Sequence, residues 1–594
     1  MSRGRRRAVA ALVALWCAAI AVRLVALQVV EHDLYRQKAK RQQQRVVELY
    51  PARGTLYDAA GRELAVSIQV ESAWADPEAV DDPRATARAV ARVVPGVDAG
   101  KLALLLADRE KSFAWVARRL DPPVARALAE LKLPGISFQR ESKRYYPNRE
   151  LAAAVLGYVG VDNHGLGGLE HFYDDKVTGR AGRRTVLRDA RHDFAVDPKL
   201  AFADPEPGYD LYLTLDASIQ YLAERELAAT VEAFHAKGGS AVVIDPATGA
   251  VLAMASYPGF DPNRFTDFPD SAWRNRAIAD AYEPGSTFKM ITAAAALGAN
   301  VIDPGDVLDC GLGAITLAGI RIRDHKPFGL LTLREVIAKS SNVGAIKTAL
   351  RVGPDRFYGT VRAFGFGQRT GIDLPGENAG LLLPAKRWTL RGAYVSFGQE
   401  ISITPLQLAL AFAAVANGGT LVRPYLVAAA GSPDGERIVR PGPQVLGRPL
   451  SAVTARELER LLEGVVTDGT GKAAAIPDYP VAGKTGTAQK AVDGSYSASR
   501  FVASFVGFAP ARRPAVVAAV VIDEPRPFYH GGQVAAPAFA AIIGPTLLYL
   551  GVPPERERPE TWPGQPAPAA GIALAADRGV APAVPRPAPG EDTW

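Results

Sequence analysis

The sequence predicts a helix-flanked sheet of the α/β or α+β type between about residues 206 and 553. Strand patterns stand near both ends of this stretch, and a largely helical region separates them. This arrangement is typical of one sheet whose faces are covered by helices. The predicted elements are strands at 209–215, 240–245, 250–256, 503–508 and 515–523, and helices at 218–234, 333–339, 343–350 and 535–550.

A basic and then apolar N-terminus predicts a membrane anchor. Four arginines within residues 3–7 precede an uncharged apolar run at 8–22, and apolar character resumes at 24–30. Together the runs suffice for the roughly 20 residues that a spanning helix needs, and Arg23 can extend its long side chain to the interface. The arginines predict a single-pass protein of the cytoplasmic (inner) membrane, with its N-terminus inside and the rest periplasmic or extracytoplasmic. A cleaved signal peptide is the alternative, because 19–21 resembles a cleavage site.

Composition and charge favour a largely soluble body outside the membrane. Hydrophobic residues make up 48% and charged residues 22% of the chain, which is too polar for a protein with many spans. The segment up to Arg45 contains ten basic and only two acidic residues, so it accounts for the formal charge of +7 of the whole chain. The sequence therefore predicts no nucleic-acid partner. Cys17 lies in the apolar run and Cys310 far outside it, so we expect no disulfide.

The length of 594 residues predicts about three domains. The region before the sheet mixes short strand-like runs with helical patterns at 83–93 and 123–131, and none of it has catalytic spacing. The C-terminal tail is dense in Pro and Ala, which predicts disorder. We expect a cytoplasmic tail, anchor and stem at 1–45, a non-catalytic pedestal at 46–205, the sheet domain at 206–553 and the tail at 554–594.

Ser286 and Lys289 form the first candidate catalytic pair. Pro284-Gly285 breaks the chain, and an apolar, alanine-rich helix then begins with Ser286 in its first turn. Side chains at i and i+3 share a helix face, so the lysine amine can reach the serine hydroxyl. A buried lysine with a lowered pKa can serve as the base that a serine nucleophile needs. Ser-x-x-Lys alone is common, however, and a helix-start serine with a surface lysine is the alternative.

Two further motifs follow along the chain. Ser340-Ser341-Asn342 stands between two predicted helices, where side chains two positions apart can both face a cleft. In Gly483-Lys-Thr-Gly-Thr487 two glycines let another backbone approach a strand closely, and the lysine offers a cation for a substrate carboxylate. Each motif alone also fits a cap or a glycine-rich turn. The order Ser-x-x-Lys, Ser-x-Asn, Lys-Thr-Gly is that of penicillin-binding proteins and class A β-lactamases.

The resemblance covers nearly all of the chain outside the tail. The chain resembles a class B penicillin-binding protein, a peptidoglycan D,D-transpeptidase of the division (septal) type. Glu400 departs from the family, which often has glycine there. Matching segments include Arg53-Gly-Thr-Leu-Tyr-Asp58, Gly157-Tyr-Val-Gly160, Gly167-Gly-Leu-Glu170, Leu213-Thr-Leu-Asp216, Asn275-Arg-Ala277, Thr404-Pro-Leu-Gln407, Ala416-Asn-Gly-Gly419, Gly469-Thr-Gly471 and Gly531-Gly532.

The resemblance implies the penicillin-binding transpeptidase fold, with a helix-flanked antiparallel sheet, a dimerisation-type pedestal and one transmembrane helix. It also implies that Ser286 attacks the carbonyl between the last two D-alanines of a stem peptide, and that Lys289 takes its proton. The backbone N–H groups of Ser286 and Thr487 would form the oxyanion hole. The family's roles assign catalysis to Ser286, Lys289, Ser340, Asn342 and Lys484, and substrate binding to Thr485, Gly486 and Thr487.

The implied partners belong to cell-wall synthesis. They are lipid-linked nascent peptidoglycan as substrate, a SEDS-family glycosyltransferase and other divisome membrane proteins, and β-lactams as inhibitors. Seven histidines without ligand spacing predict no metal, and no cofactor is implied. The alternatives are an elongation-type class B transpeptidase, a class D-like β-lactamase, and a β-lactam receptor or scaffold. A class D enzyme shares Ser-Thr-Phe-Lys and Lys-Thr-Gly but needs neither pedestal nor anchor.

Overall fold

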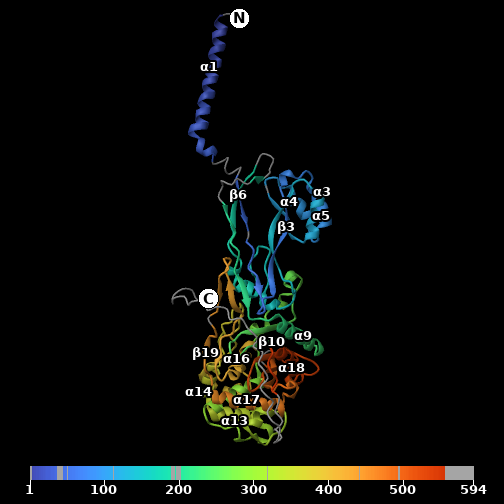
Figure 1. Ribbon diagram of the computed structural model, residues 1–594, viewed down its shortest axis with the longest axis vertical. Coiled ribbons are helices and arrows are strands. Elements are labelled where there is room, and N and C mark those ends of the chain that lie inside the picture. Colours follow the sequence, from blue (N-terminus) through green and yellow to red (C-terminus); the bar gives the residue numbers. More distant parts are fainter. Residues whose placement is uncertain are drawn as a thin grey trace, which may run out of the picture. The chain divides into compact units, whose positions relative to one another are not determined.

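The computed structural model describes residues 3–36, 44–49, 51–111, 113–188, 194–195, 202–317, 319–440, 442–492 and 495–555 (Figure 1). Helix α1 (Arg3–Val25) continues into the π-helical segment η1 (Ala26–Val30). This stretch is long and apolar enough to cross a membrane, as the sequence predicts. Most of the expected stem, and the expected disordered tail from residue 556 onward, lie outside the described residues.

Strands and short helices alternate up to about residue 213. The long strand β3 (Glu63–Ala75) pairs antiparallel with β4 (Ala114–Leu120) and β5 (Ile136–Tyr145). Buried alanine, valine and leucine side chains of this sheet and its helices form a small core. The remaining elements are β1 (Gln44–Leu49), β2 (Leu56–Tyr57), η2 (Pro77–Ala79), α3 (Pro83–Val93), α4 (Ala99–Ala107), α5 (Pro122–Glu130), α6 (Ala153–Leu156), α7 (Gly168–Phe172), α8 (Asp174–Val177), β6 (Gly182–Arg188), β7 (Phe194–Ala195) and β8 (Phe202–Ala203).

One sheet crosses the expected boundary at 205/206. β2 pairs parallel with β9 (Asp210–Leu213), which pairs antiparallel with β17 (Val427–Gly431) and, through it, with β18 (Arg437–Val439). Strands β2 to β5 and three strands of the following region therefore belong to one hydrogen-bonded sheet, whereas β1, β6, β7 and β8 form another.

A buried ionic cluster ties the N-terminal segments together. The Arg53 guanidinium donates to the Glu170 carboxylate at 2.7 Å and to Asp174 at 2.7 Å, and Arg144 donates to Glu170 at 2.5 Å. The Arg53 and Glu170 side chains are fully buried. Such a cluster is stable only when each charge keeps its partners.

The central sheet of the 206–553 region has five antiparallel strands in the order β11-β10-β22-β21-β20. The first hairpin therefore pairs with the last strands of the region, and the predicted helix-flanked sheet is confirmed. β20 is an edge strand of this sheet. The bounds are β10 (Gly238–Ile244), β11 (Val251–Tyr257), β20 (Ala482–Val492), β21 (Ser495–Ala509) and β22 (Val516–Asp523).

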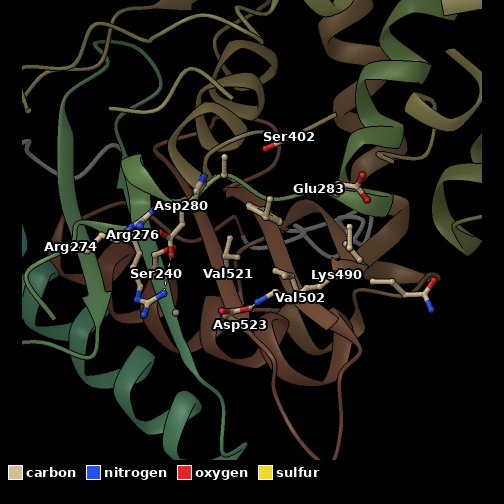
Figure 2. A pocket seen from close by; sticks show the side chains of 17 residues that line it. Ser240, Arg274, Arg276, Asp280, Glu283, Ser402, Lys490, Val502, Val521 and Asp523 are labelled. Carbon is tan, nitrogen blue, oxygen red and sulfur yellow. Dashed lines mark hydrogen bonds and ion pairs between the residues drawn. The ribbon is translucent and has the colours of Figure 1, made fainter. Parts of the chain in front are cut away.

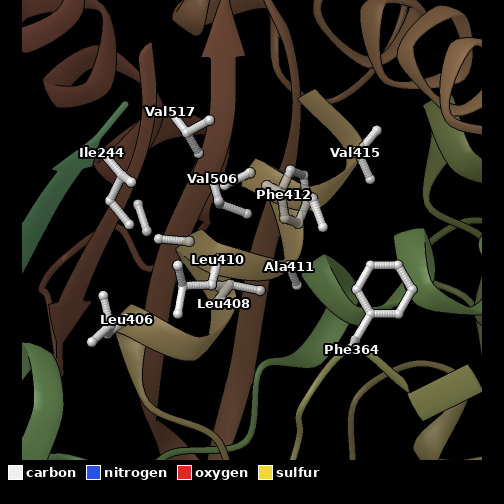
Figure 3. Close-up of a cluster of buried hydrophobic side chains, with 14 of the residues drawn as sticks. Ile244, Phe364, Leu406, Leu408, Leu410, Ala411, Phe412, Val415, Val506 and Val517 are labelled. Carbon is white, nitrogen blue, oxygen red and sulfur yellow. The ribbon is translucent and has the colours of Figure 1, made fainter. Parts of the chain in front are cut away.

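Helices cover both faces of this sheet. α9 (Ala217–Ala233) and α18 (Gly531–Tyr549) share a core with one face. α16 (Pro405–Ala416) lies against the other face, where its Leu406, Leu408 and Phe412 meet Val506 and Val517 (Figure 3). α18 is also long and apolar enough to span a membrane, but 56% of its apolar window is buried, which identifies it as a core helix.

The middle of this region is mainly helical, as predicted. Cys17 is exposed and Cys310 is buried, and both are free cysteines. The helices are η3 (Pro262–Asp267), η4 (Asp270–Ala272), α10 (Arg276–Ala279), η5 (Gly285–Phe288), α11 (Lys289–Gly298), η6 (Gly311–Gly313), α12 (Leu333–Lys339), α13 (Asn342–Val352), α14 (Pro354–Ala363), η7 (Ala385–Arg387), α15 (Trp388–Val395), α17 (Ala452–Thr467) and η8 (Lys472–Ala474). The short strands are β12 (Val307–Asp309), β13 (Ala314–Leu317), β14 (Ile320–Arg323), β15 (Leu330–Thr332), β16 (Leu421–Val422) and β19 (Val445–Gly447).

Candidate active site

Ser286 lies in the 3-10 turn η5, directly before α11. The sequence predicted Ser286 inside the first turn of the apolar helix, whereas α-helical geometry begins three residues later, at Lys289. Side chains at i and i+3 eclipse in a 3-10 turn, so the two side chains still share a face. Gly285 has φ +57°, and its N–H donates to the Gly398 carbonyl at 3.0 Å. The turn is thereby held against the loop that contains Gly398.

The Lys289 amine stands among four oxygen atoms. Nζ lies 3.0 Å from Ser286 Oγ, 2.6 Å from the Ser340 carbonyl, 3.1 Å from Ser340 Oγ and 2.8 Å from Asn342 Oδ1. The Ser340 carbonyl and Asn342 Oδ1 can only accept, so a neutral amine can donate to both while its lone pair accepts from a hydroxyl. Burial, and then the Lys484 cation, hold the pKa of Lys289 well below its usual range, while Asp324 opposes this.

The Ser340-Ser341-Asn342 motif joins α12 to α13, where the sequence placed it. Ser340 ends α12 in the left-handed conformation with φ +60°, and both its carbonyl and its hydroxyl reach Lys289. Ser341 caps α13 by accepting the Gly344 N–H at 2.9 Å. Asn342 is the first residue of α13 and presents its amide to the lysine.

Asp324 fixes this motif, and the sequence reasoning missed it. Its carboxylate accepts from the Ser341 hydroxyl at 2.7 Å, from the Asn342 N–H, and from the Val343 N–H at 3.1 Å. The start of α13, with Asn342 on it, is therefore clamped by the residue that follows β14. The sequence signal for Asp324 was an aspartate directly after a short strand of alternating pattern. Many hairpins share this pattern, so it does not by itself indicate a functional residue.

The third motif lies on the edge strand β20. Lys484 is fully buried, and its Nζ lies 3.1 Å from Ser340 Oγ. The Thr485 hydroxyl lies 2.6 Å from that of Thr470, and the Thr487 hydroxyl accepts the Gly531 N–H at 3.1 Å. Residues of this edge strand therefore contact the Ser-Ser-Asn motif through Lys484 and the start of α18 through Thr487.

Gly486 serves packing in this structure. A Cβ there would lie 2.3 Å from Ser504 Oγ and 2.9 Å from Thr287 Cγ2. A side chain at this position would push β20 away from β21 and from the nucleophile turn. Glycine is required here for close approach, which agrees with the reading of this motif as a strand.

One hydroxyl separates two buried amines. Ser340 Oγ is 3.1 Å from Nζ of Lys289 and 3.1 Å from Nζ of Lys484. Burial lowers the pKa of Lys484 to about 7. Two neighbouring buried amines disfavour a double positive charge, so a proton added at one weakens protonation at the other.

A cleft of about 650 Å³ opens over these groups. Ser286, Ser340, Asn342, Thr485 and Thr487 all line it, whereas Lys289, Lys484 and Gly486 do not line the cleft that the structure describes. The two amines therefore lie behind a wall of hydroxyl and amide groups. Residues that the sequence reasoning did not single out also line the cleft, among them His325, Lys326, Phe501, Tyr529 and His530.

Glu283 connects the nucleophile segment to two neighbouring segments. Its Oε1 accepts the Glu400 N–H at 2.9 Å and the Tyr496 hydroxyl at 3.1 Å. Glu400 has φ +58°, a left-handed conformation that explains why glycine suits this position. Its side chain pairs with Arg391 at 3.0 Å. Burial, chiefly, raises the pKa of Glu283.

These groups suit acyl transfer. A serine hydroxyl, a buried amine with a lowered pKa, and a second hydroxyl between two amines are the parts that a covalent serine mechanism needs. The threonine hydroxyls of β20 and the amide of Asn342 can hold and orient a peptide in the same cleft. All five residues predicted as catalytic meet at this point.

Two family models match the chain. The penicillin binding protein transpeptidase domain matches residues 239–544, and the penicillin-binding protein dimerisation domain matches residues 48–213. The chain is 36% identical over 561 residues to the probable peptidoglycan D,D-transpeptidase PenA of Neisseria meningitidis, covering 93% of this chain and 94% of the relative. It is 35% identical over 559 residues to the stage V sporulation protein D of Bacillus subtilis, covering 91% and 85%.

A solved structure shares the fold. Penicillin binding protein 3 of Mycobacterium tuberculosis, complexed with aztreonam, superposes with a TM-score of 0.68 at 30% identity. The match covers 86% of this chain and 98% of that chain.

Proposed function

The chain belongs to the class B penicillin-binding proteins and is a peptidoglycan D,D-transpeptidase, and on this premise we propose that Ser286 carries its acyl-enzyme. The observation behind the proposal is the 3.0 Å contact between Ser286 Oγ and the buried Lys289 amine. Burial and the Lys484 cation hold the pKa of this amine well below its usual range, which favours the neutral form that can take the serine proton.

In the acylation step Ser286 Oγ attacks the carbonyl carbon between the last two D-alanines of a stem peptide, and its proton passes to Lys289. The bond to the terminal D-alanine nitrogen breaks. The Ser340 hydroxyl, within reach of both amines, passes a proton to that nitrogen and is reprotonated from Lys289. D-Alanine leaves, and the remaining peptide stays as an ester on Ser286.

In the second step an amine of a neighbouring stem peptide attacks the ester carbonyl. A new amide bond forms, the bond to Ser286 Oγ breaks, and the amine proton returns to that oxygen through Lys289. The products are a cross-link and the free enzyme. The acceptor amine, rather than water, must therefore reach the ester first.

The donor peptide is held by β20 and the Ser-Ser-Asn turn. The Thr485 and Thr487 hydroxyls bind the terminal carboxylate, with Lys484 contributing charge from behind the cleft wall. Asn342 orients the peptide amide. The backbone N–H groups of Ser286 and Thr487 stabilise the oxyanion, where loss of one donor typically costs about 10²- to 10³-fold in rate.

The proposed setting is the division septum. Tyr282-Glu-Pro-Gly285 before the nucleophile favours the septal class, with a SEDS-family glycosyltransferase and other divisome proteins as membrane partners. The arginines at the start of α1 favour a cytoplasmic N-terminus and a catalytic region outside the membrane. The aztreonam complex of the Mycobacterium tuberculosis relative supports β-lactams as inhibitors that acylate Ser286.

Labelling with a fluorescent penicillin tests the nucleophile. Wild-type protein should form a stable adduct, and Ser286→Ala should form none. Ser495→Ala, in the exposed tip of the β20–β21 hairpin, is the control and should label normally. An adduct on Ser286→Ala, or rapid release of hydrolysed drug by the wild type, would refute the proposal.

Complementation tests the cellular role separately. In a strain depleted of its septal transpeptidase, the wild-type chain should restore division and Ser286→Ala should leave filaments. Restoration of rod shape in an elongation mutant, or of spore cortex in a sporulation mutant, without rescue of division would assign the enzyme to another process.

A further inference from the structure

A second cavity lies on the sheet face that α16 covers, beside the segment that leads to Ser286 (Figure 2). Its volume is about 390 Å³, within the range of small-ligand sites. Ser240, Val502 and Val521 form part of its floor, and residues 280–283 line it from the chain that precedes the nucleophile. Pro405, the first residue of α16, and Arg276, the first residue of α10, both line the cavity.

The charges around this cavity are separated. Arg274 and Arg276 lie at one end and share the single carboxylate of Asp280, at 2.5 and 2.9 Å. Glu283 lies toward the opposite end (Figure 2). The apolar side chains of Val502 and Val521 lie between the two ends (Figure 2). The cavity therefore has a cationic end, an apolar middle and an acidic end.

The third cation of the lining, Lys490, is already neutralised. It pairs with Asp523 at 2.7 Å and with Glu524 at 2.8 Å. Of these two carboxylates only Asp523 lines the cavity, and its pair with Lys490 lies between the arginines and Glu283 (Figure 2). Lys490 therefore adds no unpaired positive charge to the cavity.

Three buried polar atoms of residues that line the cavity have no partner within the described residues. They are Nε of Arg276, the hydroxyl oxygen of Tyr282 and Oε2 of Glu283. Buried polar atoms in native proteins are nearly always hydrogen-bonded to protein, water or ligand. Nε of Arg276 is a cationic donor and Oε2 of Glu283 is a carboxylate acceptor, and these two belong to opposite ends of the cavity.

We propose that this cavity binds a short peptide that carries a free carboxylate and a free amine, with its carboxylate at Arg274 and Arg276 and its amine at Glu283. The volume equals that of about thirteen water molecules at about 30 Å³ each, more than a single small amino acid fills. The choice of a peptidoglycan stem peptide as the source rests on the proposed acyl-transfer function. A released D-alanine has the same zwitterionic chemistry and is the competing source.

Isothermal titration calorimetry on the full chain in detergent tests the site. The background is Ser286→Ala, so binding is measured without acylation. The probe is N-acetyl-L-Ala-γ-D-Glu-L-Lys, which has free carboxylates and a free side-chain amine. Arg276→Met and Glu283→Gln should each weaken binding at least tenfold. Glu283→Gln keeps an acceptor oxygen for Glu400 and Tyr496, so it preserves the neighbouring contacts.

Arg460→Met is the matched control, because Arg460 is also paired with a carboxylate but lies outside the cavity. It should leave the affinity unchanged. Acetylating the probe's side-chain amine should weaken binding as much as Glu283→Gln does. Equal affinity for D-alanine would overturn the peptide assignment, and absence of saturable binding to the Ser286→Ala protein would overturn the site.

Acylated wild-type protein separates this cavity from the catalytic cleft. After reaction with benzylpenicillin the cleft is filled, and the probe should still bind. Loss of binding on acylation, together with indifference to Arg276→Met, would assign the probe to the cleft and refute the proposal. Failure of Ser286 to acylate would refute the proposed function but leave the binding results on Ser286→Ala intact.

Discussion

Lys289 and Lys484 operate as a pair whose proton affinity depends on their surroundings. Burial is the main cause of the lowered pKa of each amine. Charged or titratable groups around Lys289 are Lys484 on β20, Asp324 after β14, and His325 beside it. Of these, Asp324 alone raises the pKa of Lys289, so it limits how far the base becomes neutral.

Asp324→Asn should therefore alter both geometry and pH dependence. The uncharged side chain weakens the hydrogen bonds to the start of α13, so acylation by a penicillin should slow by roughly 10-fold or more. Loss of the negative charge lowers the pKa of Lys289, so the acid limb of the acylation rate should move to lower pH. Stopped-flow acylation at several pH values measures both. If the acylation rate falls but the acid limb of its pH dependence stays in place, the role of Asp324 is purely structural.

Gly398 should tolerate no side chain. It has φ +81°, and a Cβ there would lie 2.1 Å from the Gly285 carbonyl oxygen, at the nucleophile turn. Gly398→Ala should reduce acylation at least tenfold by displacing Ser286.

Gly376→Ala is the control for that prediction, because φ is +79° but nothing lies within 4 Å of its Cβ position. It should cost only the backbone strain of about 1 kcal/mol and leave acylation unchanged. Equal acylation rates for the two variants would contradict the steric argument.

The contact between Ser286 and Lys289 could be predicted from the sequence because their spacing is local, whereas Ser340, Asn342 and Lys484 were assigned only through the resemblance to the family. Ser286 and Lys289 are one turn apart, so their meeting follows from helical geometry. Asp324 could not be predicted, because its role depends on a hairpin folding back onto the start of α13. The burial of Lys484 behind Ser340 and Thr485 also depends on tertiary packing, so the spacing of its motif could not predict it.

At the scale of elements, the hydrophobic pattern predicted the ends of helices more accurately than the ends of strands. α12 has the predicted bounds, and α9 begins one residue early. β21 begins at Ser495, eight residues before the predicted start, because its outer part is exposed and polar and lacks an apolar pattern. The hairpin extends there through pairing with β20 rather than through burial.

The ionic cluster around Glu170 supports the segments that carry it. Glu170→Ala leaves Arg53 and Arg144 buried without their shared carboxylate, which should destabilise the N-terminal region by about 3–5 kcal/mol. Thermal unfolding and limited proteolysis measure the loss. Lys339→Met removes an exposed pair with Glu335 and should cost less than about 1 kcal/mol. Similar losses in the two variants would argue against the cluster's structural role.

At the scale of the whole molecule, Glu224 links stability to pH. It lies on α9, where it accepts from Gln220 and from the Ala152 N–H, and burial raises its pKa to about 7. The pKa of Glu224 in the folded state therefore exceeds the usual value of 4.5. Between pH 4.5 and about 7 the carboxyl group is protonated in the folded state and ionised in the unfolded state. The native state therefore loses stability as pH rises through about 7.

Glu224→Gln should remove this dependence. At pH 8 the variant should be more stable than the wild type by on the order of 2 kcal/mol, and at pH 4.5 the two should be nearly equal. The thermal midpoint of unfolding of both proteins should be measured across this pH range. Other titrating groups such as Glu459 are present in both proteins, so their contributions cancel in the difference between the two midpoints. A constant difference at all pH values would assign the effect to packing instead.

The pairing register of β20 has a consequence for how this enzyme can vary. Successive side chains of a strand point to opposite faces, and Lys484 pairs with Val506 and Thr487 with Ala503. Inserting one residue within β20 next to this motif would shift its pairing with β21 by one position. Each side chain of the motif would then point to the face of the sheet opposite to its present one. Insertions or deletions at the hairpin tip would leave that register untouched. Natural length variation in this hairpin is therefore expected at the tip, and none within Lys484-Thr-Gly-Thr487.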